Sequence, residues 1–404
     1  MIRTLIMGLG TGTASGGEKL AQALTKSINN SRPDKIIYIA TPQSRLTTLP
    51  HLPSTYTSEV IELQDADNLQ RIFNQLIPIF KAARMEASEL YVDYTSGTKT
   101  MTCALAMHSI LYEADILSVV SGERRNGTVQ SGTEMIQTLE PGFAVGEMKM
   151  QKAIVLFNEN NFSAAAKILE EIQAATTETT LRGRVDSLYH ASKAYYEWDR
   201  FEHVKAYDEL KQAEDTRYNM NLGFLRAFIS EKSFNQGTRN DKTPHHVADL
   251  LNNAKRRGDE ARYDDAVARL YRVVELIAQY KLRSHGVDAS RTLIEQVPQP
   301  LRSEWAIRVD KGVLRLSLQQ DFTLLKALGD LAGGIVDDSD LRGLLEARNN
   351  SILAHGISPV SEAAYSKLYV IVESNALRYV EGLKELVRKS VFLRYPVETT
   401  ARSQ

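Results

Sequence analysis

The sequence predicts an N-terminal α/β domain with a Rossmann-like, doubly wound parallel sheet, followed by a long all-helical region. Two observations support this fold class. In residues 1–147, short apolar runs alternate with amphipathic segments, and this alternation is typical of a parallel sheet covered by helices. After about Met148 the strand signals stop, and patterns with the period of a helix continue almost to the end of the chain.

Short apolar runs rich in Ile, Val, Leu and Tyr predict the strands, because Gly, Pro, Ser or Thr bounds each of them. In chain order these runs are RTLIMGLG, KIIYIAT, EVIEL, ELYVDYT and DILSVVSG. The intervening helices are predicted from GEKLAQALTKSI, NLQRIFNQLIPIFKAARM and KTMTCALAMHSILYE. The segment ERRNGTVQSGTEMIQTLEP predicts a hairpin, with Asn126-Gly127 as its turn.

The helical region contains three similar phrases, NNFSAAAKILEEI, DRFEHVKAYDEL and ARYDDAVARLYRVVELIAQY. Their unequal spacing does not support a regular solenoid, so plain helical hairpins are favoured over a weakly tetratricopeptide-like linker. The polar, proline-containing segment NQGTRNDKTPHH (235–246) predicts a loop between two helical parts. We therefore expect domains at 1–147, 148–244 and 245–395, with a flexible tail at 396–404.

Composition excludes several classes of protein. The net charge of -1 argues against strong bulk attraction to nucleic acid, so any RNA or phosphate site must be a local basic feature. Cys103 is the only cysteine, which excludes an intrachain disulfide and a cysteine-rich metal site. The pair His245-His246 has no third ligand near it in the sequence, so no metal site is expected there. No signal peptide and no apolar run approaching ~20 residues is present, so we expect a cytoplasmic protein without a membrane span.

The first predicted strand runs into a glycine-rich loop, GLGTGTASGG. Gly8, Gly10 and Gly12 are spaced wrongly for the dinucleotide fingerprint. The second strand ends in YIATPQS, which has no acid to hold a ribose, so an NAD enzyme is not predicted.

The fourth predicted strand ends in DYTSGTKTM, residues 93–101. It is not a P-loop, because Thr98 rather than glycine precedes Lys99. It does place hydroxyls, glycine backbone N–H groups and one lysine at a predicted helix N-terminus, which suits a phosphate or a nucleobase edge. Strands one and four of a doubly wound sheet end at the same edge, where ligands bind. The alternative is that both loops merely form tight turns with capping hydroxyls.

Near the C-terminus, ARNNSILAHG places Arg348 and His355 about 20° apart around a predicted helix and roughly 10 Å apart along it. Histidine is the usual acid or base at neutral pH, and arginine stabilises charge on a phosphate. RNA cleavage needs little more than these groups and no metal, and a two-fold dimer would bring two such pairs together. The alternative is an exposed arginine and a histidine that caps the helix end.

Together, the two loops and the Arg-Asn-x(5)-His motif resemble the CARF–HEPN ribonucleases, the ancillary ribonucleases of type III CRISPR systems. The resemblance covers nearly the whole chain and is least specific over 150–245. It implies a homodimer in which a CARF domain binds cyclic oligoadenylate and activates a HEPN domain that cleaves single-stranded RNA without metal. It implies no membrane or DNA partner and no cofactor besides this activator, for which we expect cyclic tetra-adenylate rather than hexa-adenylate.

The resemblance also implies site residues. The catalytic set would be Arg348, Asn349 and His355, with Glu275 as a candidate to orient Arg348. The ligand-binding set would be Gly8, Gly10, Thr11, Gly12, Thr13, Thr41, Asp93, Thr95, Ser96, Gly97, Thr98 and Lys99. Two alternatives remain at this point, a CARF regulatory or binding protein with an inactive helical domain, and a ring nuclease that degrades cyclic oligoadenylate.

Overall fold

The computed structural model describes residues 2–12, 17–125, 128–130, 132–175, 179–230, 242–339, 341–343 and 357–396. The chain divides into two compact units. Unit 1 comprises Met1–Lys152 and Ile168–Val185, and unit 2 comprises Ala153–Lys167 and Asp186–Gln404.

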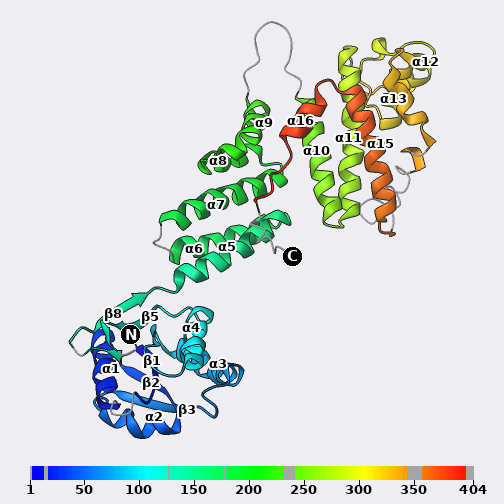
Figure 1. Cartoon of the computed structure of the whole chain (residues 1–404). Helices are drawn as coiled ribbons and strands as arrows, with labels where there is room; N and C mark the ends of the chain where they lie inside the picture. The colour runs from blue at the N-terminus through cyan, green and yellow to red at the C-terminus, as the bar shows by residue number, and fades with distance from the viewer. Residues whose placement is uncertain are drawn as a thin grey trace. The chain divides into compact units, whose positions relative to one another are not determined.

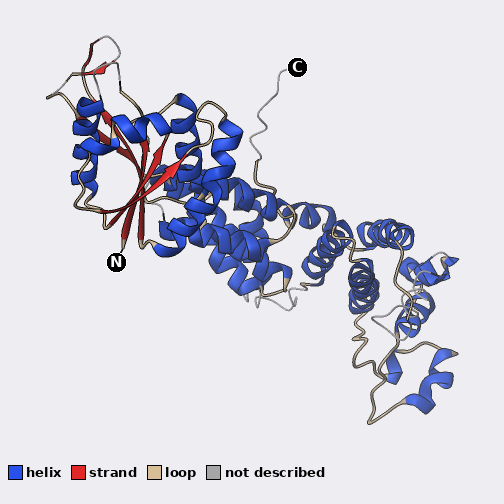
Figure 2. Ribbon diagram, turned by 90° about the horizontal axis from the view of Figure 1, so that it is seen from below, coloured by secondary structure: helices blue, strands red, loops and turns tan. Residues whose placement is uncertain are grey.

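Unit 1 contains the predicted sheet, and all five strands expected from the apolar runs are present (Figure 2). Its strand order is β3-β2-β1-β4-β5-β8, in which the first five strands are parallel and β8 pairs antiparallel with β5. A separate two-stranded hairpin, β6–β7, confirms the predicted hairpin, although its turn at 126–127 lies outside the described residues. The strands are β1 Arg3–Leu9, β2 Lys35–Ala40, β3 Thr57–Glu62, β4 Glu89–Asp93, β5 Ile116–Ser121, β6 Arg124–Arg125, β7 Thr128–Val129 and β8 Met135–Leu139.

Helices pack on both faces of this sheet. Side chains alternate along β1, so Ile6 points into one core and Leu5 and Met7 into the other. The first core is completed by side chains of α3 and α4, and the second by side chains of α1. The doubly wound arrangement is therefore confirmed. The helices of this part are α1 Gly17–Ser31, α2 Pro42–Thr47, α3 Leu69–Glu86 and α4 Lys99–Leu111, with a 3₁₀ turn at Leu49–His51.

The rest of the described chain is helical, as predicted. Helices α5, α6 and α7 each contribute residues to both units, and α8 onward belongs to unit 2. In unit 2, α10, α11 and α15 lie side by side (Figure 1). The helices are α5 Gly142–Asn158, α6 Phe162–Ala175, α7 Thr179–Asp199, α8 His203–Gln212, α9 Asn219–Ile229, α10 Thr243–Asp259, α11 Tyr263–Ser284, α12 Leu301–Trp305, α13 Leu318–Ala327, α15 Glu362–Tyr379 and α16 Leu383–Lys389. The 3₁₀ turns of this region are Thr216–Tyr218, Ile294–Gln296, Ala306–Arg308 and Leu331–Asp337.

The loop predicted at 235–246 is wrong at its end, because α10 already begins at Thr243. Pro244 does not prevent this, since proline is tolerated in the first turn of a helix, where its missing N–H has no partner in any case. His245 and His246 consequently pack on Phe228, with ring centroids 5.8 and 4.6 Å away. Residues 231–241 and the tail from 397 lie outside the described residues.

Candidate functional site

The loops after β1 and β4 meet at the carboxyl edge of the sheet. The Gly10 N–H donates to Ser96 Oγ at 2.6 Å. A Cβ at Gly8 would lie 2.5 Å from the Ser96 carbonyl oxygen, and one at Gly10 would lie 2.9 Å from the Gly97 nitrogen. The two backbones therefore approach so closely that only glycine fits on the β1 side. The predicted convergence of these loops is confirmed, and β1 and β4 are the neighbours at which the strand order reverses.

The Asp93 carboxylate fixes the position of the loop that follows β4. It is fully buried and accepts hydrogen bonds from Ser27 Oγ at 2.5 Å, the Thr95 N–H at 2.9 Å and Ser118 Oγ at 3.1 Å. Burial raises the pKa of Asp93, and these hydrogen bonds oppose the shift. Thr95 Oγ1 in turn accepts from the Val120 N–H at 2.8 Å. These contacts give Asp93 and Thr95 a positioning role, in which they fix the course of the loop.

The hydroxyls at the start of α4 are also used within the domain. Thr98 caps the helix, because its Oγ1 accepts from the Met101 N–H at 3.2 Å. Thr98 and Thr100 both donate to the Ala66 carbonyl, at 2.7 and 2.5 Å. Lys99 differs from them, because its side chain is exposed and no contact to another described residue is found for it. Lys99 is therefore an exposed cation at this edge.

Thr41, at the end of β2, caps α2 through a reciprocal pair of hydrogen bonds with Ser44, of 3.1 and 2.8 Å. Just after α2, Thr48 donates to the Gly10 carbonyl at 2.7 Å, which ties the β1 loop to this helix. This role of Thr48 could not be predicted, because nothing in its local sequence marks it. Further along the β1 loop, Thr11 is partly exposed and Gly12 is exposed, whereas Thr13 lies outside the described residues.

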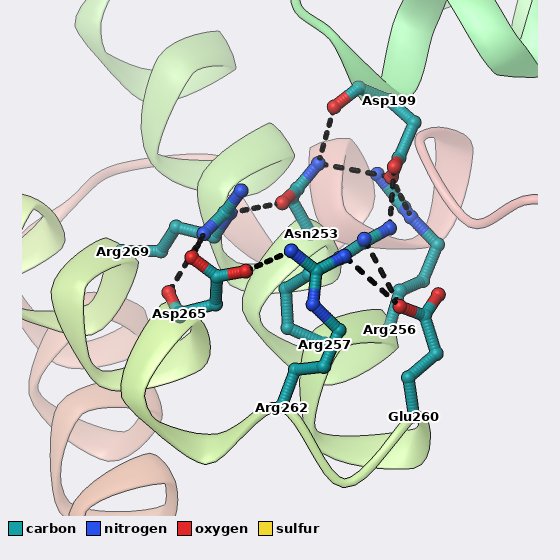
Figure 3. Close-up of polar contacts among 8 residues, drawn as sticks. All are labelled: Asp199, Asn253, Arg256, Arg257, Glu260, Arg262, Asp265 and Arg269. Carbon is teal, nitrogen blue, oxygen red and sulfur yellow. Dashed lines mark hydrogen bonds and ion pairs between the residues drawn. The ribbon is translucent and has the colours of Figure 1, made fainter. Parts of the chain in front are cut away.

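Unit 2 contains a partly buried network of ion pairs where the end of α7 meets α10 and α11 (Figure 3). Asp199, the last residue of α7, accepts from Arg256 Nε at 2.9 Å and from Arg257. The network extends through Asn253, Glu260, Arg262, Asp265 and Arg269. Burial raises the pKa of Glu260 and lowers that of Arg269.

Comparison with known proteins assigns the helical part. A model of the Csm6 6H domain matches residues 145–233, and a model of the Csm6 HEPN domain matches residues 235–378. Together they span more than half of the chain. This chain belongs to the Csm6 family of CRISPR-associated CARF–HEPN ribonucleases. No curated protein matches the sequence.

Among solved structures, Enterococcus italicus Csm6 bound to cyclic hexa-2′-fluoro-hexa-dAMP is similar in fold to this Csm6-family chain. The two share 12% identity with a TM-score of 0.65, over 97% of this chain and 100% of that one. Can2 from Sulfobacillus thermosulfidooxidans, in complex with cyclic tetra-adenylate, shares 13% identity over 50% of this chain and 68% of that one. Its TM-score of 0.21 is too low to carry a structural argument.

In the HEPN domain of this Csm6-family protein, the predicted catalytic residues Arg348, Asn349 and His355 lie outside the described residues. Glu275 on α11 pairs with Arg272 at 2.8 Å. Asp321 on α13 is only 3% exposed, and its Oδ1 has no hydrogen-bond partner. Burial and the nearby Glu275 carboxylate raise the pKa of Asp321 to about 7.

His203 in the 6H region and His245 and His246 at the start of the HEPN region have contacts within the protein. His203 Nε2 lies 2.7 Å from Asp249 Oδ2, and Trp198 donates to the other carboxylate oxygen at 3.0 Å. Burial is the main cause that lowers the pKa of His245 and His246. Among the residues that the structure describes, no group of three side chains is arranged to hold a metal ion. Within the same residues, no helix is both long and apolar enough to cross a membrane.

Proposed function

We propose that this protein is a cyclic-oligoadenylate-activated, metal-independent endoribonuclease that cleaves single-stranded RNA in type III CRISPR defence. One observation carries the proposal. The Csm6 HEPN model spans residues 235–378, and the Arg348–His355 motif lies inside that span. In this proposal the protein works in the cytoplasm as a homodimer.

The catalytic roles follow from the chemistry of the motif. His355 transfers a proton during attack of the RNA 2′-hydroxyl or departure of the leaving oxygen. Arg348 stabilises the charge that develops on the phosphate, and Asn349 helps to hold it. Because one histidine cannot easily serve both proton transfers, the partner subunit supplies the second set.

The activator site is proposed at the carboxyl edge of the sheet. Gly8 and Gly10 let the two loops lie close together at this edge. Lys99 supplies the positive charge for a phosphate of the activator. The solved Enterococcus italicus Csm6 was bound to a hexa-adenylate analogue, so the preference expected here for the tetra-adenylate ring needs a direct comparison of both rings.

The catalytic proposal is tested by measuring cleavage of labelled single-stranded RNA in EDTA, with and without activator. Arg348→Ala and His355→Ala should each abolish cleavage while activator binding stays unchanged. His51→Ala, an exposed histidine in unit 1, is the matched control and should cleave normally. Normal cleavage by the His355 variant would refute the catalytic assignment.

The sensor proposal is tested with both ring sizes. Lys99→Ala should raise the activator concentration needed for half-maximal cleavage by about tenfold, since one charge-assisted contact is lost. Lys81→Ala, an exposed lysine on α3, should leave it unchanged. A chain that binds the activator without cleaving RNA would be a regulatory protein instead. One that degrades only the cyclic oligoadenylate would be a ring nuclease.

A further inference from the structure

Unit 2 contains a cavity of about 170 Å³, several times the ~30 Å³ that one water molecule occupies in the liquid. Three segments that are far apart in the sequence line it. They are the turn between α5 and α6, one side of α10, and the chain after α16, residues 391–394. None of the residues at the sheet edge is among the residues that line it.

The polar groups that line this cavity are mostly cationic or neutral. Lys255 and Arg256 come from α10, and Arg394 from the chain after α16. Lys255 and Arg394 are exposed, and no ion-pair partner for either is found among the described residues. Asp259 is the one carboxylate in the lining. Three cations against one acid favour an anion in the cavity.

The positive charge of Arg256 is only partly balanced by neighbouring carboxylates. The residue is 6% exposed, and its Nε donates to Asp199 at 2.9 Å. The Asp199 carboxylate also accepts a hydrogen bond from Arg257. Arg256 Nη2 is buried and has no hydrogen-bond partner. In the network of Figure 3, four arginines face three carboxylates, which leaves one positive charge in excess. A buried cation of this kind is stabilised when an anion binds beside it.

The aromatic residue Phe392 in the lining bears on whether the cavity can bind a nucleobase. One face of Phe392 stacks on Tyr195, with the ring centroids 4.2 Å apart. The guanidinium of Arg256 lies 3.7 Å from the centroid of the same ring. Two groups of the protein thus already pack against Phe392, so it is a poor platform for a nucleobase. The polar groups favour a phosphate over a base.

Two of the three asparagine side chains that line the cavity already form hydrogen bonds within the protein. The Asn158 side chain donates to the Tyr395 carbonyl at 3.0 Å and accepts from the Tyr395 N–H at 2.8 Å, which holds the C-terminal segment against the α5–α6 turn. Asn252 donates to the Val387 carbonyl at 2.8 Å. Asn160, which sits in the turn itself with φ of 61°, has no side-chain hydrogen bond to another described residue. It is therefore free to donate to a bound oxyanion.

We propose that this cavity is a second anion-binding site, which takes a phosphate group through Lys255, Arg256, Arg394 and Asn160. The phosphate can come from inorganic phosphate, from a mononucleotide or from the 5′ end of an RNA, and the chemistry of recognition is the same for all three. Its residues differ from those proposed for the activator and cleavage sites, so its existence does not depend on the proposed function.

Binding can be followed through Trp198, whose ring centroid lies 5.0 Å from that of Phe392. In the full-length Trp305→Phe protein, Trp198 is the only tryptophan left. Titration in phosphate-free buffer should give a saturable change in emission with inorganic phosphate and with AMP, and none with adenosine. The same titration with a 5′-phosphorylated RNA oligonucleotide and with its unphosphorylated form tests whether the 5′ end of an RNA supplies the phosphate. Isothermal titration calorimetry checks the affinities.

Lys255→Ala and Arg394→Ala should each weaken phosphate binding by about tenfold, as expected for the loss of one charge-assisted contact. The matched controls Lys211→Ala and Arg226→Ala, exposed residues on α8 and α9, should bind as the parent does. The Lys99→Ala variant should also bind normally. The proposal is overturned if phosphate gives no saturable signal at millimolar concentration, or if the Lys255 and Arg394 variants retain full affinity. It is equally overturned if only Lys99→Ala loses binding, because the phosphate would then sit at the sheet edge.

Discussion

Replacing Asp199 with alanine tests whether the buried ion pairs at the end of α7 hold unit 2 together. The side chains of Arg256 and Arg257 are only 7% and 8% exposed, and both depend on the Asp199 carboxylate. Without it, Arg257 keeps Glu260 at 3.0 Å, whereas Arg256 keeps only its stacking on Phe392. Removal of one partner from a buried pair costs about 3–5 kcal/mol. Because Arg257 retains one acid, we expect about 3 kcal/mol for Asp199→Ala.

Arg262→Ala is the matched control, because it belongs to the same network but its side chain is 53% exposed. Exposed pairs contribute about 0–1 kcal/mol. The assay is urea unfolding followed by Trp198 emission in the Trp305→Phe protein, since Trp198 immediately precedes Asp199 in α7. If the free energy of unfolding falls by less than about 1 kcal/mol for Asp199→Ala, or by the same amount in both variants, the network does not stabilise unit 2 as argued.

Three further predictions concern single contacts. Gly8→Ala places a Cβ 2.5 Å from the Ser96 carbonyl oxygen and should cost about 1–3 kcal/mol in thermal unfolding, whereas Gly142→Ala, with no atom within 4 Å, should cost nothing. Ser96→Ala removes the acceptor of the Gly10 N–H, so hydrogen exchange at that amide should speed up at least tenfold; unchanged exchange would contradict the contact. Asp321 has a pKa of about 7 in the folded protein against 3.8 unfolded, so its contribution is complete below pH 3.8 and is lost as the pH rises through 7. Urea unfolding of the parent should therefore lose up to about 4 kcal/mol over this pH range that Asp321→Asn does not lose, and parallel pH profiles would refute this.

Strands β1, β2, β4 and β5 could be predicted from the sequence because strands buried on both faces appear as continuous apolar runs. The short helix α2 was missed, since six residues are too few to show a helical period. The start of α10 was missed for a different reason. Its first turn contains Pro244 and a polar pair of histidines, and its position depends on packing against Phe228, which lies earlier in the chain.

The meeting of the two loops at the sheet edge could be predicted as well, because the topology of a doubly wound sheet places the ends of β1 and β4 next to each other. The individual roles at that edge could not. Thr98 and Thr100 look like ligand contacts in sequence, but both hydroxyls are bound by the Ala66 carbonyl more than thirty residues away. Asp93 likewise carries no signal in the sequence that distinguishes a buried support from an exposed contact. Such roles depend on partners that only the tertiary structure supplies.

The small net charge of the chain conceals how its charges are distributed. Lys255, Arg256 and Arg257 are consecutive in sequence and suggest an exposed basic patch. Successive residues of a helix point about 100° apart, so of these three residues only Lys255 reaches solvent, while Arg256 and Arg257 turn toward Asp199. One short run therefore supplies both the buried ion pairs and the exposed lysine of the proposed anion site. A charge count excludes bulk attraction to nucleic acid, but it does not exclude a cation placed where one phosphate can reach it.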